Sequence, residues 1–167
     1  MVKSVDELLQ MDDYERAEYL YYKARKLGKR LNPKYEEFIK INIVWAIYYA
    51  EDIIKGRWPD AEPVIMKSYA NAYYYAKYVI KGRWPEAEKI IIKNPKYTCW
   101  YTLDVIKNRW PEAEPYIIKH PEWAYTYAKY IIKERWEEAE EYIKKDNYYW
   151  KEYCNHFEIG NNSNEIS

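Results

Sequence analysis

The sequence predicts an all-α protein, a right-handed α-solenoid of short helix pairs stacked in the manner of HEAT or TPR repeats. Three observations predict it. Apolar residues follow a helical spacing, and proline or glycine stands where helices would begin and end. An Arg-Trp pair also recurs at intervals of 26 residues, at 57–58, 83–84, 109–110 and 135–136. Repeats of this length are stacked units, each of which buries its apolar face against its neighbours.

The N-terminal segment is expected to be a helical cap. Ser4 and Glu7 have the spacing of a capping box, and the pattern from Asp13 to Leu27 predicts a helix that ends at Gly28. Residues 30–39 resemble a degenerate repeat. We therefore predict a single domain in which residues 1–42 form an N-terminal cap with a degenerate repeat, 43–158 form tandem repeats ending in a polar C-terminal cap, and 159–167 form a disordered tail.

Residues 69–93 illustrate one repeat. Small and apolar side chains at 72, 75, 76, 79 and 80 form one face of a long helix. Lys81 is expected to close its last turn, and Gly82 is expected to take the left-handed conformation that commonly ends a helix. Pro85 suits the first position of a second helix of about two turns. Each repeat is therefore predicted to be a long helix, a tight corner and a short helix.

Alignment of the repeats separates recurring positions from variable ones. Four columns keep one kind of side chain, which favours a packing role. Two hold small residues, one holds tyrosine and one holds isoleucine: Ala46, Ala72, Thr98 and Ala124; Ala50, Ala76, Thr102, Ala128 and Cys154; Tyr49, Tyr75, Tyr101, Tyr127 and Tyr153; Ile65, Ile91, Ile117 and Ile143.

Three columns on the long helices vary between repeats and yet remain rich in aromatic residues. Tyrosine and tryptophan are enriched in protein interfaces and their hot spots. We therefore predict a partner-binding aromatic face with the candidates Trp45, Tyr48, Tyr73, Tyr74, Tyr97, Trp100, Trp123 and Tyr125. The alternative is that these rings fill the space between narrow helical layers.

One lysine and one arginine in each repeat form a basic ladder: Lys55, Arg57, Lys81, Arg83, Lys107, Arg109, Lys133 and Arg135. Such a ladder could bind the phosphates of a nucleic acid or nucleotide. Acidic residues follow each step, however, and the planar guanidinium of arginine pairs well with carboxylates. Structural ion pairing is therefore the favoured interpretation.

Composition and motifs argue against several functions. The 27 basic and 27 acidic residues give a net charge of zero, so no global field favours nucleic acid or an anionic membrane. Two cysteines make no disulfide framework, no segment is apolar enough for a membrane span, and no secretory signal is present, so a cytoplasmic location is expected. No metal-ligand spacing, phosphate loop or nucleophile motif occurs. We predict no catalytic residue, metal or cofactor.

The segment Ala-Tyr-Tyr-Tyr-Ala-Lys-Tyr-Val-Ile-Lys-Gly-Arg-Trp-Pro-Glu-Ala-Glu at 72–88 resembles short helical repeats in uncharacterised proteins of tailed bacteriophages and other mobile elements. The resemblance covers about residues 43–158. It implies a small viral protein that engages a host macromolecule, such as a defence system, in the host cytoplasm. We therefore expect a non-enzymatic module that binds a host protein. Nucleic-acid or nucleotide binding and a structural, self-assembling role are the alternatives, and the oligomeric state stays open.

Overall fold

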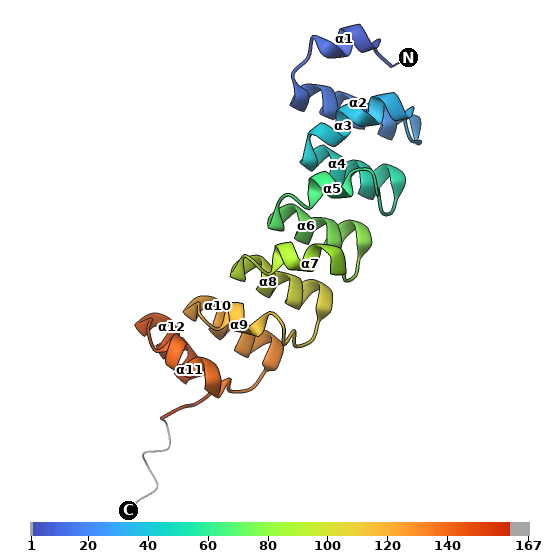
Figure 1. Cartoon of the computed structure of the whole chain (residues 1–167). Coiled ribbons are helices and arrows are strands. Elements are labelled where there is room, and N and C mark those ends of the chain that lie inside the picture. Colours follow the sequence, from blue (N-terminus) through green and yellow to red (C-terminus); the bar gives the residue numbers. More distant parts are fainter. Residues whose placement is uncertain (1, 161–167) are drawn as a thin grey trace, which may run out of the picture. The chain divides into compact units, whose positions relative to one another are not determined.

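A computed structural model describes residues 2–160, which form helices and no strand (Figure 1). The all-helical class predicted from the sequence is confirmed. The chain divides into two compact units, Met1–Ile90 (unit 1) and Ile91–Ser167 (unit 2). This division falls within the tandem repeats. Of the predicted tail, residues 161–167 lie outside the described part of the chain.

Unit 1 alternates long and short helices. In chain order they are α1 (Val5–Leu9), α2 (Asp13–Leu27), α3 (Pro33–Ile41), α4 (Ile43–Tyr49), the π-helix η1 (Ala50–Ile54), α5 (Glu62–Ile65), α6 (Tyr69–Tyr75), the π-helix η2 (Ala76–Ile80) and α7 (Pro85–Ile91). Helix α2 packs against α3 and α4, and α4 lies beside α6 (Figure 1). The long helices of this unit therefore contact one another directly.

Unit 2 has the same alternation. Its elements are α8 (Pro95–Tyr101), the π-helix η3 (Thr102–Ile106), α9 (Glu114–Ile117), α10 (Pro121–Tyr127), the π-helix η4 (Ala128–Ile132), α11 (Glu137–Ile143) and α12 (Asn147–His156). Helix α10 contacts α8 on one side and α12 on the other, while α9 and α11 connect them.

The predicted helix ends in the N-terminal segment are confirmed. The Ser4 hydroxyl accepts the Glu7 N–H at 3.3 Å, and the Glu7 carboxylate accepts the Ser4 N–H at 2.7 Å. Both polar groups of this capping box are thus satisfied. Helix α2 has the predicted bounds, and Gly28 ends it in the left-handed conformation with φ 65°.

The long helices of the repeats end differently from the prediction. Each widens into a π-helix, and the lysine that follows it is left-handed, with φ between 58° and 64°. The N–H groups of Lys81 and Gly82 both donate to the carbonyl of Ala76. Lys81, and not Gly82, therefore takes the left-handed conformation, which corrects the prediction for Gly82. Because that column needs no glycine, it holds Asn108 and Glu134 in later repeats.

The short helices have two lengths, and an additional proline accounts for the difference. Helices α7 and α11 have 7 residues each, the two turns predicted, whereas α5 and α9 have 4. The shorter pair carries an additional proline, Pro63 or Pro115. Proline has no N–H to donate to the preceding turn, so the residues before it form turns and the helix begins later.

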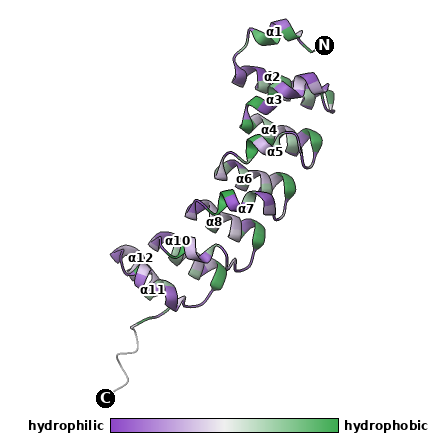
Figure 2. Ribbon diagram, in the orientation of Figure 1, coloured by the Kyte–Doolittle hydropathy of each residue, from purple (hydrophilic) through white to green (hydrophobic). Residues whose placement is uncertain are grey.

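The recurring columns form the core of each unit. All of their tyrosine and isoleucine side chains are fully buried, as are the small residues, apart from partly buried Cys154. The Tyr75 ring lies 5.0 Å from the Trp84 ring, and Tyr127 lies 5.3 Å from Trp136, in tilted pairs. In Figure 2 the long helices are most hydrophobic toward their π-helical ends, where isoleucine and valine gather. The predicted packing columns are confirmed.

Candidate functional site, a tyrosine groove in unit 1

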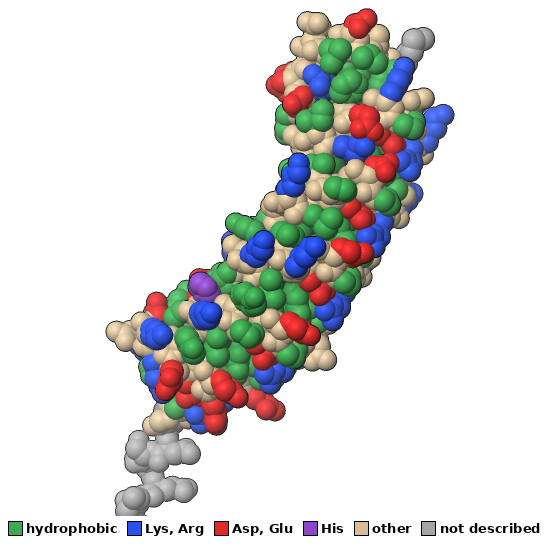
Figure 3. Space-filling model, viewed as in Figure 1, with side chains coloured by type: hydrophobic (Ala, Val, Ile, Leu, Met, Phe, Trp, Pro, Cys, Tyr) green, Lys and Arg blue, Asp and Glu red, His purple; other side chains and the backbone are tan. Residues whose placement is uncertain are grey.

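The arginines of the basic ladder are held in ion pairs. Nε and Nη2 of Arg57 donate to the two carboxylate oxygens of Glu62 at 2.8 Å and 2.7 Å. The same five-residue spacing pairs Arg83 with Glu88, Arg109 with Glu114 and Arg135 with Glu140. In Figure 3 acidic and basic side chains are interspersed over the visible face, as expected for paired charges. For the arginines, the ion-pairing interpretation is confirmed.

A tyrosine from the following long helix completes the contacts of Glu62, Glu114 and Glu140. The hydroxyl of Tyr75 donates to Glu62 at 3.2 Å and accepts the backbone N–H of Trp58 at 2.5 Å. We call this set of one arginine, tryptophan, glutamate and tyrosine the Arg–Trp–Glu–Tyr clamp. Burial of its phenol raises the pKa of Tyr75 to about 12, although the Trp58 N–H opposes the shift. The clamp is structural, because the guanidinium, the carboxylate, the phenol and the backbone N–H of the tryptophan are hydrogen-bonded to one another.

The lysines of the ladder meet in pairs within each unit. Lys55 and Lys81 line a recess of about 350 Å³ that also contains the carboxylates of Glu51 and Asp52. Lys107 and Lys133 line a recess of about 360 Å³ with Tyr130, Asn108 and Thr102. No acidic side chain is among the described residues lining this second recess. An anion would therefore meet a more favourable potential in unit 2.

Three of the eight aromatic candidates are buried in the chain itself. Trp45, Tyr73 and Tyr125 are 6%, 3% and 9% exposed, so they do not form the expected exposed face. Tyr73 and Tyr125 belong to a column whose other members, Ile47 and Cys99, are also buried. That column faces the core, and its rings fill space there, as the alternative interpretation held.

The other candidates have accessible surface. Tyr48 and Tyr74 are 46% and 37% exposed. Tyr97, Trp100 and Trp123 in unit 2 are partly buried, and the Tyr97 and Trp100 rings pack edge to face at 5.5 Å. Of the eight, Tyr48 and Tyr74 are therefore the most available to a partner.

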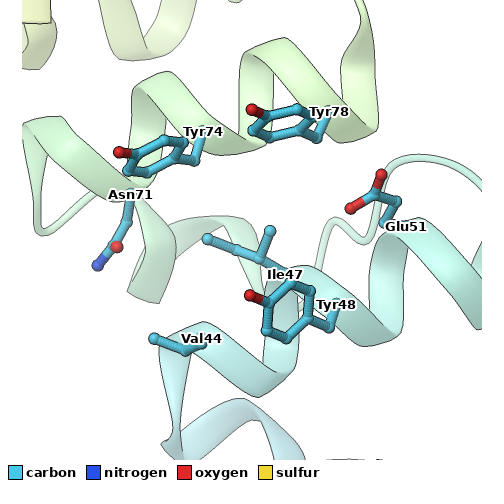
Figure 4. Close-up of a pocket in the computed structure, with 7 residues that line it drawn as sticks. All are labelled: Val44, Ile47, Tyr48, Glu51, Asn71, Tyr74 and Tyr78. Carbon is cyan, nitrogen blue, oxygen red and sulfur yellow. The ribbon is translucent and has the colours of Figure 1, made fainter.

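Tyr48 and Tyr74 line the same groove between α4 and the α6–η2 helix (Figure 4). The groove has a volume of about 490 Å³, and its other lining residues are Val44, Ile47, Glu51, Asn71 and Tyr78. Tyr74 and Tyr78 lie one helical turn apart with nearly parallel rings, 6.2 Å between centroids. Their rings form one wall, and Val44 and Tyr48 form the opposite wall. The groove thus offers aromatic faces with a few polar groups at its rim.

Sequence reasoning missed Val44 and Tyr78, which are both exposed. A signal was available, because Val44 precedes Tyr48 by four residues and Tyr78 follows Tyr74 by four. Residues at this spacing share one face of a helix. Extending the exposed column by one turn in each direction would have found them.

The chemistry of the groove suits binding. Its rings can cover an apolar or aromatic side chain, while the Asn71 amide and the Glu51 carboxylate can hydrogen-bond to a ligand backbone. Among residues 2–160, no three His, Cys, Asp or Glu side chains gather where they could hold a metal ion. No helix in the described part of the chain is long and apolar enough to cross a membrane.

Comparisons of this chain with protein families, with curated proteins and with solved structures found no match.

Proposed function

We propose that this protein is a non-enzymatic helical-repeat module that binds another protein through the groove lined by Val44, Tyr48, Tyr74 and Tyr78. We further propose that its repeats form a right-handed α-solenoid with capped ends. The observation that carries the binding proposal is the groove itself, in which four exposed apolar side chains face one another across two neighbouring helices.

The size and composition of the groove support this function. A volume of about 490 Å³ is enough to accept one or two side chains of a partner. Tyrosine provides a large contact area and has few rotatable bonds to immobilise. Neighbouring rings restrict the motion of these tyrosines before a partner binds. Tyr48 packs at a tilt against Trp45, with 5.7 Å between ring centroids, and Tyr78 stacks on Tyr74. Such preorganisation lowers the entropic cost of association.

The nature of the partner rests on the resemblance of the repeats to those of phage proteins. We propose a host protein as the partner, encountered in the host cytoplasm, with a component of a defence system as the leading candidate. Binding of this protein would then block or distort a surface that the host protein needs for its own function.

A second candidate function is the binding of a nucleic acid or nucleotide. The observation that favours it is the recess of unit 2 in which Lys107, Lys133 and Tyr130 meet. The ladder arginines contribute less, because each is already paired with a glutamate. Phosphate contacts predict an affinity that falls steeply with salt, whereas an apolar groove predicts a weak salt dependence. A third candidate, self-assembly, predicts light scattering that rises with protein concentration.

The experiment is affinity capture from a host lysate with the full chain, followed by mass spectrometry and a binding titration. Tyr74→Ala is expected to weaken the captured interaction at least about tenfold, the effect of an interface hot spot. Tyr116→Ala is the matched control, because Tyr116 is 50% exposed but does not line the groove. A partner that binds Tyr74→Ala and the unmodified chain equally would contradict the proposal.

A further inference from the structure

A second recess in unit 1 adjoins the tyrosine groove and differs from it in chemistry. It lies between α2 and α4, has a volume of about 610 Å³, and shares Val44, Tyr48 and Glu51 with the groove. Its walls include the rings of Tyr14, Tyr22 and Trp45 and the carboxylate of Glu18. No basic side chain is among the described residues that line it. The recess therefore combines aromatic faces with negative charge.

The aromatic part of the recess is centred on Trp45. Its ring centroid lies 5.7 Å from Tyr14, 5.8 Å from Tyr22 and 5.7 Å from Tyr48. Trp45 is buried by these neighbours, whereas Tyr14 and Tyr22 are 52% and 53% exposed. Exposed aromatic faces attract cations through the ring quadrupole, and several converging rings can surround a cationic group.

The acidic part of the recess contains carboxylates that are not used within the chain. Asp52 accepts a hydrogen bond from the Tyr21 hydroxyl, which Arg25 also approaches at 3.4 Å. Glu18 and Glu51, in contrast, form no side-chain hydrogen bond or ion pair with any of residues 2–160. Lysines line the neighbouring recesses that Glu18 and Glu51 also border, but neither carboxylate is paired with one of these described lysines, so both can accept a hydrogen bond from a ligand.

From this juxtaposition we infer that the recess binds the guanidinium group of an arginine side chain of the partner protein. The inference deepens the proposed protein-binding function and rests on it. A planar guanidinium stacks on aromatic rings and donates in pairs to carboxylates, whereas the ammonium of lysine is a strongly hydrated point charge. A partner segment with an apolar side chain in the tyrosine groove would place a nearby arginine in this recess.

The test uses the full chain and two small probes, acetyl-arginine amide and acetyl-citrulline amide. Citrulline has nearly the shape of arginine but carries no charge. Binding is followed by NMR through the indole N–H of Trp45, assigned with Trp45→Phe. We expect saturable shifts with the arginine probe and none with the citrulline probe. Equal responses to the two probes, or no response to arginine, would overturn the inference.

Substitutions test whether Glu18 and Glu51 bind the arginine probe. Glu18→Gln combined with Glu51→Gln keeps the shape of both side chains, and it is expected to weaken binding of the arginine probe about tenfold or more, as for the loss of a charge-assisted contact. Glu112→Gln, an exposed carboxylate in unit 2, is the control and should leave binding unchanged. Unchanged binding by the double variant would place the arginine elsewhere and overturn the assignment.

The two proposals fail in different ways. If the arginine probe does not bind but capture of a partner still depends on Tyr74, only the arginine recess is wrong. If capture does not depend on Tyr74 while the probe binds in a manner that needs Glu18 and Glu51, the recess stands and the groove proposal is wrong.

Discussion

The hydroxyl of Tyr127 lies 3.0 Å from a carboxylate oxygen of Glu114, thirteen residues earlier in the chain. The same hydroxyl accepts the backbone N–H of Trp110 at 2.7 Å. One oxygen atom thus serves a buried backbone donor and a largely buried carboxylate at once. This double role explains why the column contains tyrosine in every repeat, since phenylalanine would fill the same space but satisfy neither group.

Tyr127→Phe tests the role of this hydroxyl. The change keeps the ring packing and leaves the Trp110 N–H and the Glu114 carboxylate with one partner fewer. We expect the free energy of unfolding to fall by about 1–3 kcal/mol, measured by urea denaturation with tryptophan fluorescence. Tyr116→Phe, at an exposed position in the same unit, should have almost no effect. Equal stability of the two variants would contradict the role of the clamp.

Glu62→Gln tests the ion pair of a clamp in unit 1. The Glu62 side chain is 10% exposed, and its loss of charge weakens the contacts with Arg57 and Tyr75. Because Arg57 is 46% exposed and partly screened by water, we expect a loss of about 1–2 kcal/mol in the free energy of unfolding. Glu37→Gln breaks the pair with Lys40, in which the glutamate is 66% exposed, and should change stability by less than about 0.5 kcal/mol.

The clamp tyrosines predict a loss of stability at high pH. Burial raises the pKa of Tyr75 and Tyr153 from 10.0 to about 12. Between these values the unfolded chain has lost phenolic protons that the folded chain retains, so rising pH favours unfolding. The stabilisation is complete below pH 10 and is lost as the pH approaches 12. Denaturation at a series of pH values should show this decline, and Tyr75→Phe should make it shallower. A flat profile would show that these phenols ionise as freely as exposed ones.

Two glycines are expected to respond oppositely to alanine. Gly28 has φ 65°, where a side chain costs about 1–2 kcal/mol, so Gly28→Ala should destabilise the protein. Gly56 is not in the left-handed region and a methyl group there meets nothing within 4 Å. Gly56→Ala should therefore leave the melting temperature unchanged or raise it slightly. Lys55→Gly removes a side chain from a left-handed position, so this change should also raise the melting temperature.

The two cysteines should differ in reactivity. Cys99 is fully buried, and burial raises the pKa of its thiol to about 12, so little thiolate forms and access is blocked. Cys154 is only partly buried, although its pKa is also raised by burial. Labelling with a thiol reagent should be fast at one cysteine and slow at the other, with Cys154 identified as the fast site by peptide mapping. In urea the two should react alike.

The packing positions could be predicted because the same side chains recur at them from repeat to repeat. Tyr75, Ala72 and Ile91 recur in kind, because each repeat places its column residues among the same kinds of neighbour. The helix ends were less predictable. Glycine is the residue that most often takes the left-handed conformation after a helix, which favoured Gly82. The π-helical turn instead places that conformation at Lys81. The invariant lysine was the better signal, since the glycine column also admits Asn108.

The candidate site was predicted only in part, because variation between repeats does not report exposure. Tyr73 and Cys99 share a variable column and are both buried, so variation in a column does not mark an exposed face. Tyr48 and Tyr74 vary for a different reason, because they face outward. Only a structure that places the helices can distinguish variable residues that are buried from variable residues that are exposed. The recess around Trp45 was missed because α2, which forms one wall, lies in the N-terminal cap, where the sequence matches the repeat only loosely.

The spacing within the clamp restricts how this chain can change its length. Glu62, Glu114 and Glu140 each contact a tyrosine thirteen residues onward and an arginine five residues back, so the partners of one clamp lie in two successive helices. A gene duplication or deletion of one full period would leave every such partnership in register. An insertion of a few residues between the two helices would separate a glutamate from its phenol, so growth by whole periods is the route that keeps the fold.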